Sequence, residues 1–395
     1  LFAAPSTPLR PAQPFQQGES RIGVGKPCLP LHLAPIFRKV AEGRVREAAM
    51  AKNWVAAVMG LAALCAAAPA GAQTRLFRDD SELAMVIEGP IGDLVRRAQR
   101  NTDPVPAVLT VENARYEMEL SPRGFSRRTL GICQFPPLRI NLSGERQGTI
   151  LQGQNKLKLV TRCRAGASYE QLTVLEYTTY RLYNELTPLS FRVRPVRVTY
   201  RDNTSRRREE TQFNFLIEDV GDLARRNRRV ALEVQTREVA STQLDPEQAA
   251  IVGLFQFMIG NLDWDMVEGH PGEECCHNGK LLAASATGRE NIVPVPYDFD
   301  YSGFVNAPYA TPPAGFNTPN VRQRVYRGYC RYNAQAQAAA ELFRSRRERI
   351  YAIINGETRL SEARRTSARR YIEDFYEILD NPQRFQRNVL DACRG

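Results

Sequence analysis

The chain has 395 residues, of which 43% are hydrophobic and 25% are charged, and its formal net charge is +11. This composition is typical of a globular protein long enough for two domains or lobes. The arginines are scattered in short runs, at 206–208, 225–226, 228–229 and 344–349, rather than gathered in one tract. Such runs are typical of solvated surfaces and argue against a nucleic-acid partner.

The first 72 residues predict processing rather than a fold. Residues 1–49 are Pro-rich and have no sustained period, and we expect them to be non-native upstream or disordered sequence. Residues 50–72 have a basic start, a short apolar run and an AGA site, the pattern of a cleaved signal peptide. The apolar run is shorter than the roughly 20 residues that span a membrane. We therefore expect a secreted or periplasmic protein without a stable membrane span.

The cysteines after residue 72 predict disulfide bonds, because six of them remain in a chain that we expect to be exported. Cys133 and Cys163 flank consecutive strand-like runs, and we expect them to pair. We expect the other four to pair among themselves, with the adjacent Cys275 and Cys276 bonded to the two later cysteines, Cys330 and Cys393.

Strand-like segments dominate the region 73–218. Short alternating runs rich in β-branched and aromatic residues predict strands, at 107–111, 115–121, 138–142, 157–163, 191–200 and 213–218. One helix, at 169–186, interrupts them, because its apolar residues recur at three- and four-residue spacing. We expect this region to form a β-rich N-lobe with one helix.

The region 219–395 has a helical pattern. Asp245 and Pro246 form a plausible helix start, with Asp as the N-cap and Pro at the first helical position. The expected helices lie at 222–234, 245–261, 333–354, 359–380 and 383–393. An irregular stretch at 261–330, with catalytic-type loops, separates them. The whole layout predicts an α+β chain of two lobes with a ligand in the cleft between them.

Three short motifs in the second half carry the candidate chemistry: GNLDW, HNGKLL and VPVPYDFDYSG. They contribute Asp263, Asn278 and Asp298, and the apolar run 292–297 predicts a strand with Asp298 at its end. A cation such as Mg²⁺ takes oxygen ligands, often one or two carboxylates plus phosphate oxygens. A separate Asp can accept the proton of a hydroxyl nucleophile. The ordinary alternative is that these residues only cap loops, since Asp and Asn favour turns; the ordered set favours catalysis.

In this order, and with SPRGFSRR upstream at 121–128, the motifs resemble the CotH (spore-coat protein) kinase family over roughly 115–305. The resemblance implies a two-lobed protein-kinase-like fold that binds ATP with Mg²⁺ or Mn²⁺. Carried over, it makes Asp263 the catalytic base and Asp298 the principal metal ligand. Asn278 becomes the second ligand by analogy with protein kinases, and Asp300 a supporting one. The chain between Asp263 and Asn278 is longer than kinases have.

The resemblance also requires a strand cation that contacts the phosphates and a helix glutamate that holds it. Glu176 is the candidate glutamate. Lys158 is the preferred cation, and Lys156 lies on the same face of its strand. Arg139 is the cation of the segment that aligns with the family's lysine-rich strand. There is no G-x-G-x-x-G loop, and Arg123 in SPRGFSRR either contacts phosphate or belongs to an ordinary turn.

The expected function is transfer of a phosphoryl group from ATP to a hydroxyl of a protein or a small molecule, with AMP transfer left open. A pseudokinase or binding module is the alternative, favoured by the missing Gly-rich loop and the scarcity of ATP outside the cytoplasm. A secreted zinc hydrolase is a third interpretation. It rests on His270, Cys275, Cys276 and His277, although three consecutive residues cannot readily reach one tetrahedral ion.

Overall fold

The computed structural model describes residues 74–269 and 274–395, and these residues belong to one compact unit. The expected upstream segment 1–49, the predicted signal peptide 50–72 and His270 lie outside the described residues. Over the part of the chain that the structure describes, no helix has the length and apolar character needed to cross a membrane.

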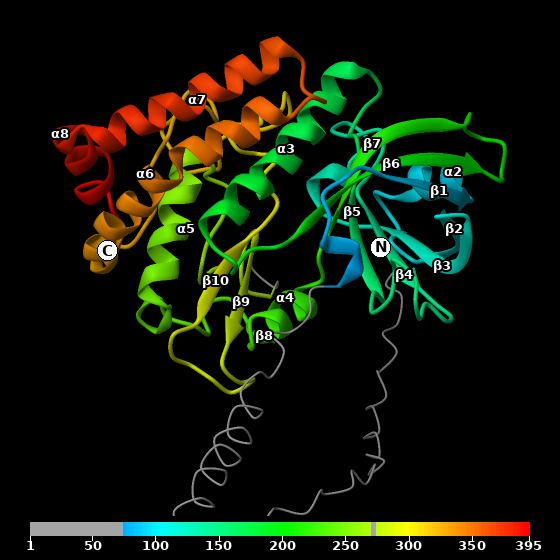
Figure 1. Ribbon diagram of the computed structural model, residues 1–395, viewed down its shortest axis with the longest axis horizontal. Helices are drawn as coiled ribbons and strands as arrows, with labels where there is room; N and C mark the ends of the chain where they lie inside the picture. The colour runs from blue at the N-terminus through cyan, green and yellow to red at the C-terminus, as the bar shows by residue number, and fades with distance from the viewer. Residues whose placement is uncertain (1–73, 270–273) are drawn as a thin grey trace, which may run out of the picture. The chain divides into compact units, whose positions relative to one another are not determined.

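Seven strands form a closed barrel (Figure 1). They are β1 (Leu83–Gly89), β2 (Val105–Val111), β3 (Ala114–Pro122), β4 (Leu138–Leu142), β5 (Lys156–Val160), β6 (Val193–Asp202) and β7 (Glu210–Ile217). Around the barrel the order is β1, β2, β3, β4, β5, β7, β6. All neighbours are antiparallel except β1 and β6, which pair in parallel and close the ring, with Leu83 opposite Val196.

Alternation along the strands fills the barrel with apolar side chains. In β5, Leu157 and Leu159 are buried in the barrel core, while Lys156 and Lys158 point to the outer face. The outer face of β7 is apolar as well, because the helix α3 (Ala167–Leu186) packs against its Phe213 and Phe215. Tyr177 of α3 lies edge-on to Phe213 of β7, with ring centroids 6.0 Å apart.

The prediction of a two-lobed protein-kinase-like fold with a helical C-lobe is wrong. The strands close into a mixed seven-stranded barrel, and the region after 219 contains a second, three-stranded sheet beside its helices. The sequence pattern revealed six of the barrel strands but missed β1, and β1 is the strand that closes the ring. Its parallel pairing with β6 depends on residues far away in the chain, which local alternation does not report.

The helices of the second half pack beside α3, and Figure 1 shows α3 between the barrel and the helices α5 to α7. The helices after α3 are α4 (Val220–Arg226), α5 (Pro246–Ile259), α6 (Asn333–Gly356), α7 (Glu362–Asp380) and α8 (Pro382–Phe385); α2 (Ile91–Arg97) precedes it. The predicted helix start is confirmed, because the Asp245 carboxylate accepts a hydrogen bond from the Gln248 backbone N–H at 2.8 Å.

A second sheet of three strands lies beside α5, in the order β10 (Val293–Pro296), β9 (Gly279–Ala283), β8 (Val230–Leu232). The predicted helix at 222–234 is therefore wrong in its second half, where β8 follows α4. Leu232 pairs with Leu281 of β9, so tertiary pairing overrides the local helical pattern. The predicted helix at 383–393 is α8 followed by a π-helix, Gln386–Leu390.

The six cysteines form three disulfide bonds, which fit an oxidising compartment. The predicted bond between Cys133 and Cys163 is confirmed, with Cα atoms 4.6 Å apart. The prediction that Cys275 and Cys276 bond to the two later cysteines is wrong. Those two bond to each other, and Cys330 bonds to Cys393 because its backbone N–H donates to the Arg394 carbonyl at 2.9 Å.

Candidate functional site

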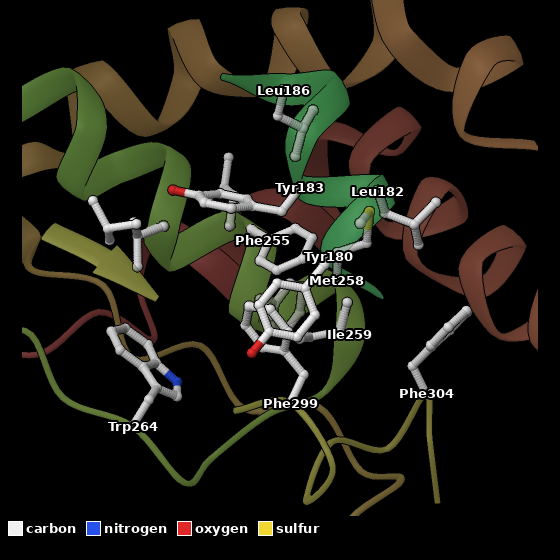
Figure 2. Close-up of a cluster of buried hydrophobic side chains, with 14 of the residues drawn as sticks. Tyr180, Leu182, Tyr183, Leu186, Phe255, Met258, Ile259, Trp264, Phe299 and Phe304 are labelled. Atoms are coloured by element: carbon white, nitrogen blue, oxygen red, sulfur yellow. The ribbon is translucent and has the colours of Figure 1, made fainter. Parts of the chain in front are cut away.

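Buried aromatic rings fix both acidic segments of the site. Phe299 stands between Asp298 and Asp300 in the chain and is fully buried. Its ring centroid lies 4.7 Å from that of Tyr180 on α3 and 5.5 Å from that of Phe255 on α5. Figure 2 shows these three rings meeting inside the cluster, with Trp264 at its edge. The residue that follows Asp263 is Trp264, so each acid is attached to a core anchor.

Asp263 lies in a hydrogen-bonded group with two residues of the HNGKLL motif. Its Oδ1 is 2.7 Å from Nε2 of His277. The side-chain amide of Asn278 donates from Nδ2 to the Asp263 carbonyl at 2.7 Å and to Oδ2 at 3.0 Å. The structure therefore brings Asp263 and Asn278 together despite the long intervening chain. Since the Asn278 amide nitrogen makes both bonds, its Oδ1 is oriented away from Asp263.

The pairing of β9 and β10 places Asn278 beside Asp298. Gly279 lies opposite Pro296, so the residue before β9 meets the residues after β10, and the Tyr297 N–H donates to the Asn278 carbonyl at 3.0 Å. Both Asn278 and Asp298 have positive φ, 49° and 64°. Asn and Asp tolerate this left-handed region better than other non-glycine residues. The predicted strand that delivers Asp298 is thus confirmed as β10.

The Asp298 carboxylate has no hydrogen bond or ion pair with another described residue. Its backbone N–H donates to the Tyr180 hydroxyl at 2.9 Å, which anchors the turn. The side chain is half-buried. A carboxylate held at a fixed turn and left without a protein partner is a suitable ligand for a divalent cation.

Asp300 lies deeper, in a buried charge cluster with Glu176 and Arg127. Their side chains are at most 7% exposed. Arg127 Nη1 is 3.3 Å from Glu176 Oε2 and 3.8 Å from Asp300 Oδ2. The Tyr309 hydroxyl donates to Asp300 Oδ2 at 3.0 Å.

Burial shifts both carboxylates of this cluster toward their neutral forms. Burial and the charge of Asp298 raise the pKa of Asp300 to about 7, against the opposing effect of Arg127. Burial likewise raises the pKa of Glu176 well above its usual range, and Arg127 again opposes the shift. Asp263 and Asp298 both contribute to the shift of Asp300, so all three aspartates lie within electrostatic reach of one another.

Of the three predicted cations, Lys158 alone is placed beside the acids. Its Nζ lies 4.7 Å from the ring centroid of Tyr297, next to Asp298 in the chain. Arg139 lies opposite Lys158 in the β4–β5 register, but its side chain and that of Lys156 are exposed. Among the described residues, no ion pair joins Lys158 to Glu176; the cation of Glu176 is Arg127.

The environment of Lys158 disfavours its charged form. Burial lowers the pKa of Lys158 to about 7, and the positive charges of Arg123 and Lys280 act in the same direction. In the unfolded chain the pKa of the Lys158 ammonium has the ordinary lysine value of about 10.4. Between about pH 7 and about pH 10.4 the unfolded state therefore binds more protons, and stability rises with pH.

We therefore expect Lys158→Met to stabilise the protein. The gain should be about 1 kcal/mol near pH 6, a small value because the side chain is only partly buried and water screens part of its charge. The gain corresponds to a rise in Tm of about 1 to 2 °C, and it should shrink toward pH 10. Thermal unfolding of wild type and variant at both pH values measures this, and a gain that is equal at both would contradict it.

The sequence reasoning missed Arg127 and gave His277 only a secondary part. Arg127 belongs to SPRGFSRR, in which Arg123 is the candidate phosphate contact. The three arginines of that segment look alike in the sequence, and only the packing shows that Arg127 is buried while Arg123 and Arg128 are half-buried.

The donors nearest the Asp298 turn are oxygen atoms, the ligand type of Mg²⁺ and Mn²⁺. The Asp298 carboxylate and the Asn278 amide oxygen are hard oxygen donors, of the kind Mg²⁺ uses together with phosphate and water. Across residues 74–269 and 274–395, no group of three or more His, Cys, Asp or Glu side chains is arranged to hold a metal ion. The disulfide between Cys275 and Cys276 also ties up both sulfur ligands that the zinc interpretation needs.

Two depressions in the described part of the surface lie away from Asp263 and Asp298. One of about 580 Å³ follows α7 between Arg322 and Tyr371, and none of the candidate site residues lines it. A small cavity of about 10 Å³ touches Asn278 and Lys280 at the edge of the site.

The predicted Asp263, Asn278 and Asp298 thus gather at the ends of α5, β9 and β10, with Lys158 of β5 near Tyr297, while Arg139 and Lys156 remain outside. Comparison with known proteins adds no family: no family model matches the chain, and no curated protein matches it.

Proposed function

We propose that the protein transfers a phosphoryl group from ATP, with Mg²⁺ or Mn²⁺, to a hydroxyl of a protein or a small molecule. The observation that carries the proposal is the meeting of Asp263, Asn278 and the unpartnered Asp298 carboxylate at the ends of β9 and β10, with Lys158 beside them. The resemblance of the motifs to the CotH kinase family supports the same reaction. The resemblance bears on the chemistry and not on the fold, because the strands form a closed barrel.

Asp298 and Asn278 would hold the metal ion. The ion would neutralise charge on the phosphate oxygens during transfer. Asp298 would use its carboxylate, which lies on a turn anchored by Tyr180. Asn278 would use its side-chain Oδ1, because its Nδ2 makes both hydrogen bonds to Asp263. Asp300 stays a supporting residue, since Arg127 and Tyr309 already contact it.

Asp263 would orient the acceptor hydroxyl and take its proton. The contacts from His277 and Asn278 hold this carboxylate in one orientation, as a general base requires. Lys158 would contact the phosphates. Its ammonium is desolvated and flanked by other cations, so an anionic phosphate compensates a charge that the free protein holds at a disadvantage.

We also propose that the reaction takes place outside the cytoplasm, after removal of the signal peptide 50–72. The three disulfide bonds support this location. ATP would then have to be supplied from the cell.

The test is an assay of the purified protein with ATP labelled at the γ-phosphate, with Mg²⁺ or Mn²⁺ and a mixture of protein and small-molecule acceptors. We expect metal-dependent nucleotide binding and transfer of the label, both lost when the metal is chelated. A parallel reaction with ATP labelled at the α-phosphate detects AMP transfer. Failure to bind ATP with either metal would overturn the proposal.

A binding module without turnover is the second candidate. The observation that favours it is the Arg127–Glu176 ion pair, because the family resemblance implies that the glutamate holds the strand lysine instead. In the same assay, nucleotide binding without transfer of either label would support this candidate.

A further inference from the structure

One guanidinium joins four segments that are far apart in the chain. Arg127 belongs to the short 3-10 turn η2 (Ser126–Arg128). Its Nη2 donates to the Thr161 carbonyl, just after β5, at 2.6 Å. Its Nη1 reaches Glu176 on α3 and Asp300 after β10, at 3.3 and 3.8 Å. These contacts connect the barrel, the helix and the acidic loop through a single side chain.

We propose that Arg127 is a positioning residue of the site, which holds Glu176 and Asp300 together and thereby fixes the turn that carries Asp298. The inference rests on the proposed function, because it assigns Arg127 a part in binding the metal and the nucleotide. Arg127 touches neither of them and acts through the acids.

The charges of the cluster explain why an arginine is needed. Glu176 and Asp300 are both buried, and without a cation they would face each other across a desolvated space. The guanidinium is planar and presents several donors in a fixed fork, so it can serve Thr161 and both carboxylates at once. A lysine ammonium carries the same charge, but it is a point donor without that fork.

The same contacts explain the state of Lys158. Because Arg127 occupies Glu176, the Lys158 ammonium lies over the Tyr297 ring and makes no ion pair with any described residue. In this arrangement Arg127 forms the ion pair with Glu176, and Lys158 would contact the phosphates. The family resemblance implies that one lysine both pairs with the helix glutamate and contacts the phosphates. Here these two roles would belong to two different cations.

The neighbouring arginine provides a matched control. Arg128 lies on the same turn, and its bonds go to backbone carbonyls, those of Gly124 at 2.5 Å and Ala98 at 3.1 Å. It contacts neither Glu176 nor Asp300 in the described structure. Arg128→Met therefore removes an arginine of the same turn without disturbing the acids.

The experiment titrates Mn²⁺-ATP into wild type, Arg127→Met, Arg127→Lys and Arg128→Met by calorimetry. We expect Arg127→Met to weaken binding at least about 10-fold, since a displacement of about 1 Å at such a site can have a 10²-fold effect. Arg127→Lys should recover part of the affinity, and Arg128→Met should match wild type. Circular dichroism confirms that each variant is folded.

A second variant keeps the test valid if Arg127→Met does not fold. Arg127→Met with Glu176→Gln removes one buried charge of each sign, which is better tolerated than removing one partner alone. It should fold and still bind Mn²⁺-ATP at least about 10-fold more weakly. Wild-type affinity in this double variant or in Arg127→Met would overturn the role of Arg127. Absence of binding by wild type itself would instead overturn the proposed function, and this inference with it.

Discussion

Asp298→Asn should reduce transfer of the γ-phosphoryl group by at least about 10³-fold, which makes it the largest effect that we expect. The substitution preserves the shape of the side chain and removes its charge. Because the carboxylate has no ion pair among the described residues, the loss should fall on the proposed cation rather than on the fold. Mn²⁺ affinity should fall together with transfer, and thermal stability should stay close to that of wild type.

The control for this variant is Asp374→Asn, on the exposed face of α7. It makes the same change of charge and should leave transfer and Mn²⁺ affinity unchanged. Calorimetric titration with Mn²⁺ alone and the labelled-ATP assay give the two measurements. Full transfer by Asp298→Asn would remove Asp298 from the list of metal ligands.

Phe299→Ala should lower the free energy of unfolding by about 3 to 5 kcal/mol, the usual range for removing a buried phenylalanine. The ring is fully buried and lies edge-on to Tyr180 and Phe255, so its loss leaves a cavity between α3 and α5. It also releases the anchor between Asp298 and Asp300. We therefore expect transfer per folded molecule to fall by about 10²-fold as well.

Phe343→Ala separates these two effects. Phe343 on α6 is also fully buried, with its ring centroid 5.7 Å from that of Phe375, but it is not adjacent to any candidate site residue in the chain. The Phe343→Ala variant should lose a similar free energy of unfolding and keep the wild-type transfer rate per folded molecule. Urea unfolding gives the stability of both variants. Equal transfer by both would show that the ring does not position the acids.

The local patterns of the sequence located most elements correctly. The α3 helix begins at Ala167 and ends at Leu186, close to the predicted 169–186, because its apolar residues recur at helical spacing along this whole stretch. The cap at Asp245 and the strand before Asp298 could be predicted for the same reason. Each depends on residues within a few positions of one another, and such signals survive without knowledge of the fold.

Two of the errors have one physical origin, which is pairing over long distances. The closure of β1 on β6 and the strand β8 in place of a helix end both depend on which segments meet in space. The bond between the adjacent Cys275 and Cys276 is instead a local feature, which the expectation of distant partners overlooked. The candidate site shows the same division. Asp263, Asn278 and Asp298 could be named from their motifs, whereas the pairing of Glu176 with Arg127 could not, because either arginine or lysine satisfies a sequence pattern.

Closure of the barrel by a parallel pair has a consequence for how the chain folds. During synthesis β1 emerges long before its partner β6, and until then one edge of β1 has no neighbour. Contacts between such distant segments slow folding, because a large loop must close before the pairing stabilises it. An open strand edge is also a template for aggregation. The N-terminal strand is therefore the segment that most needs protection by a chaperone before the rest of the barrel is available.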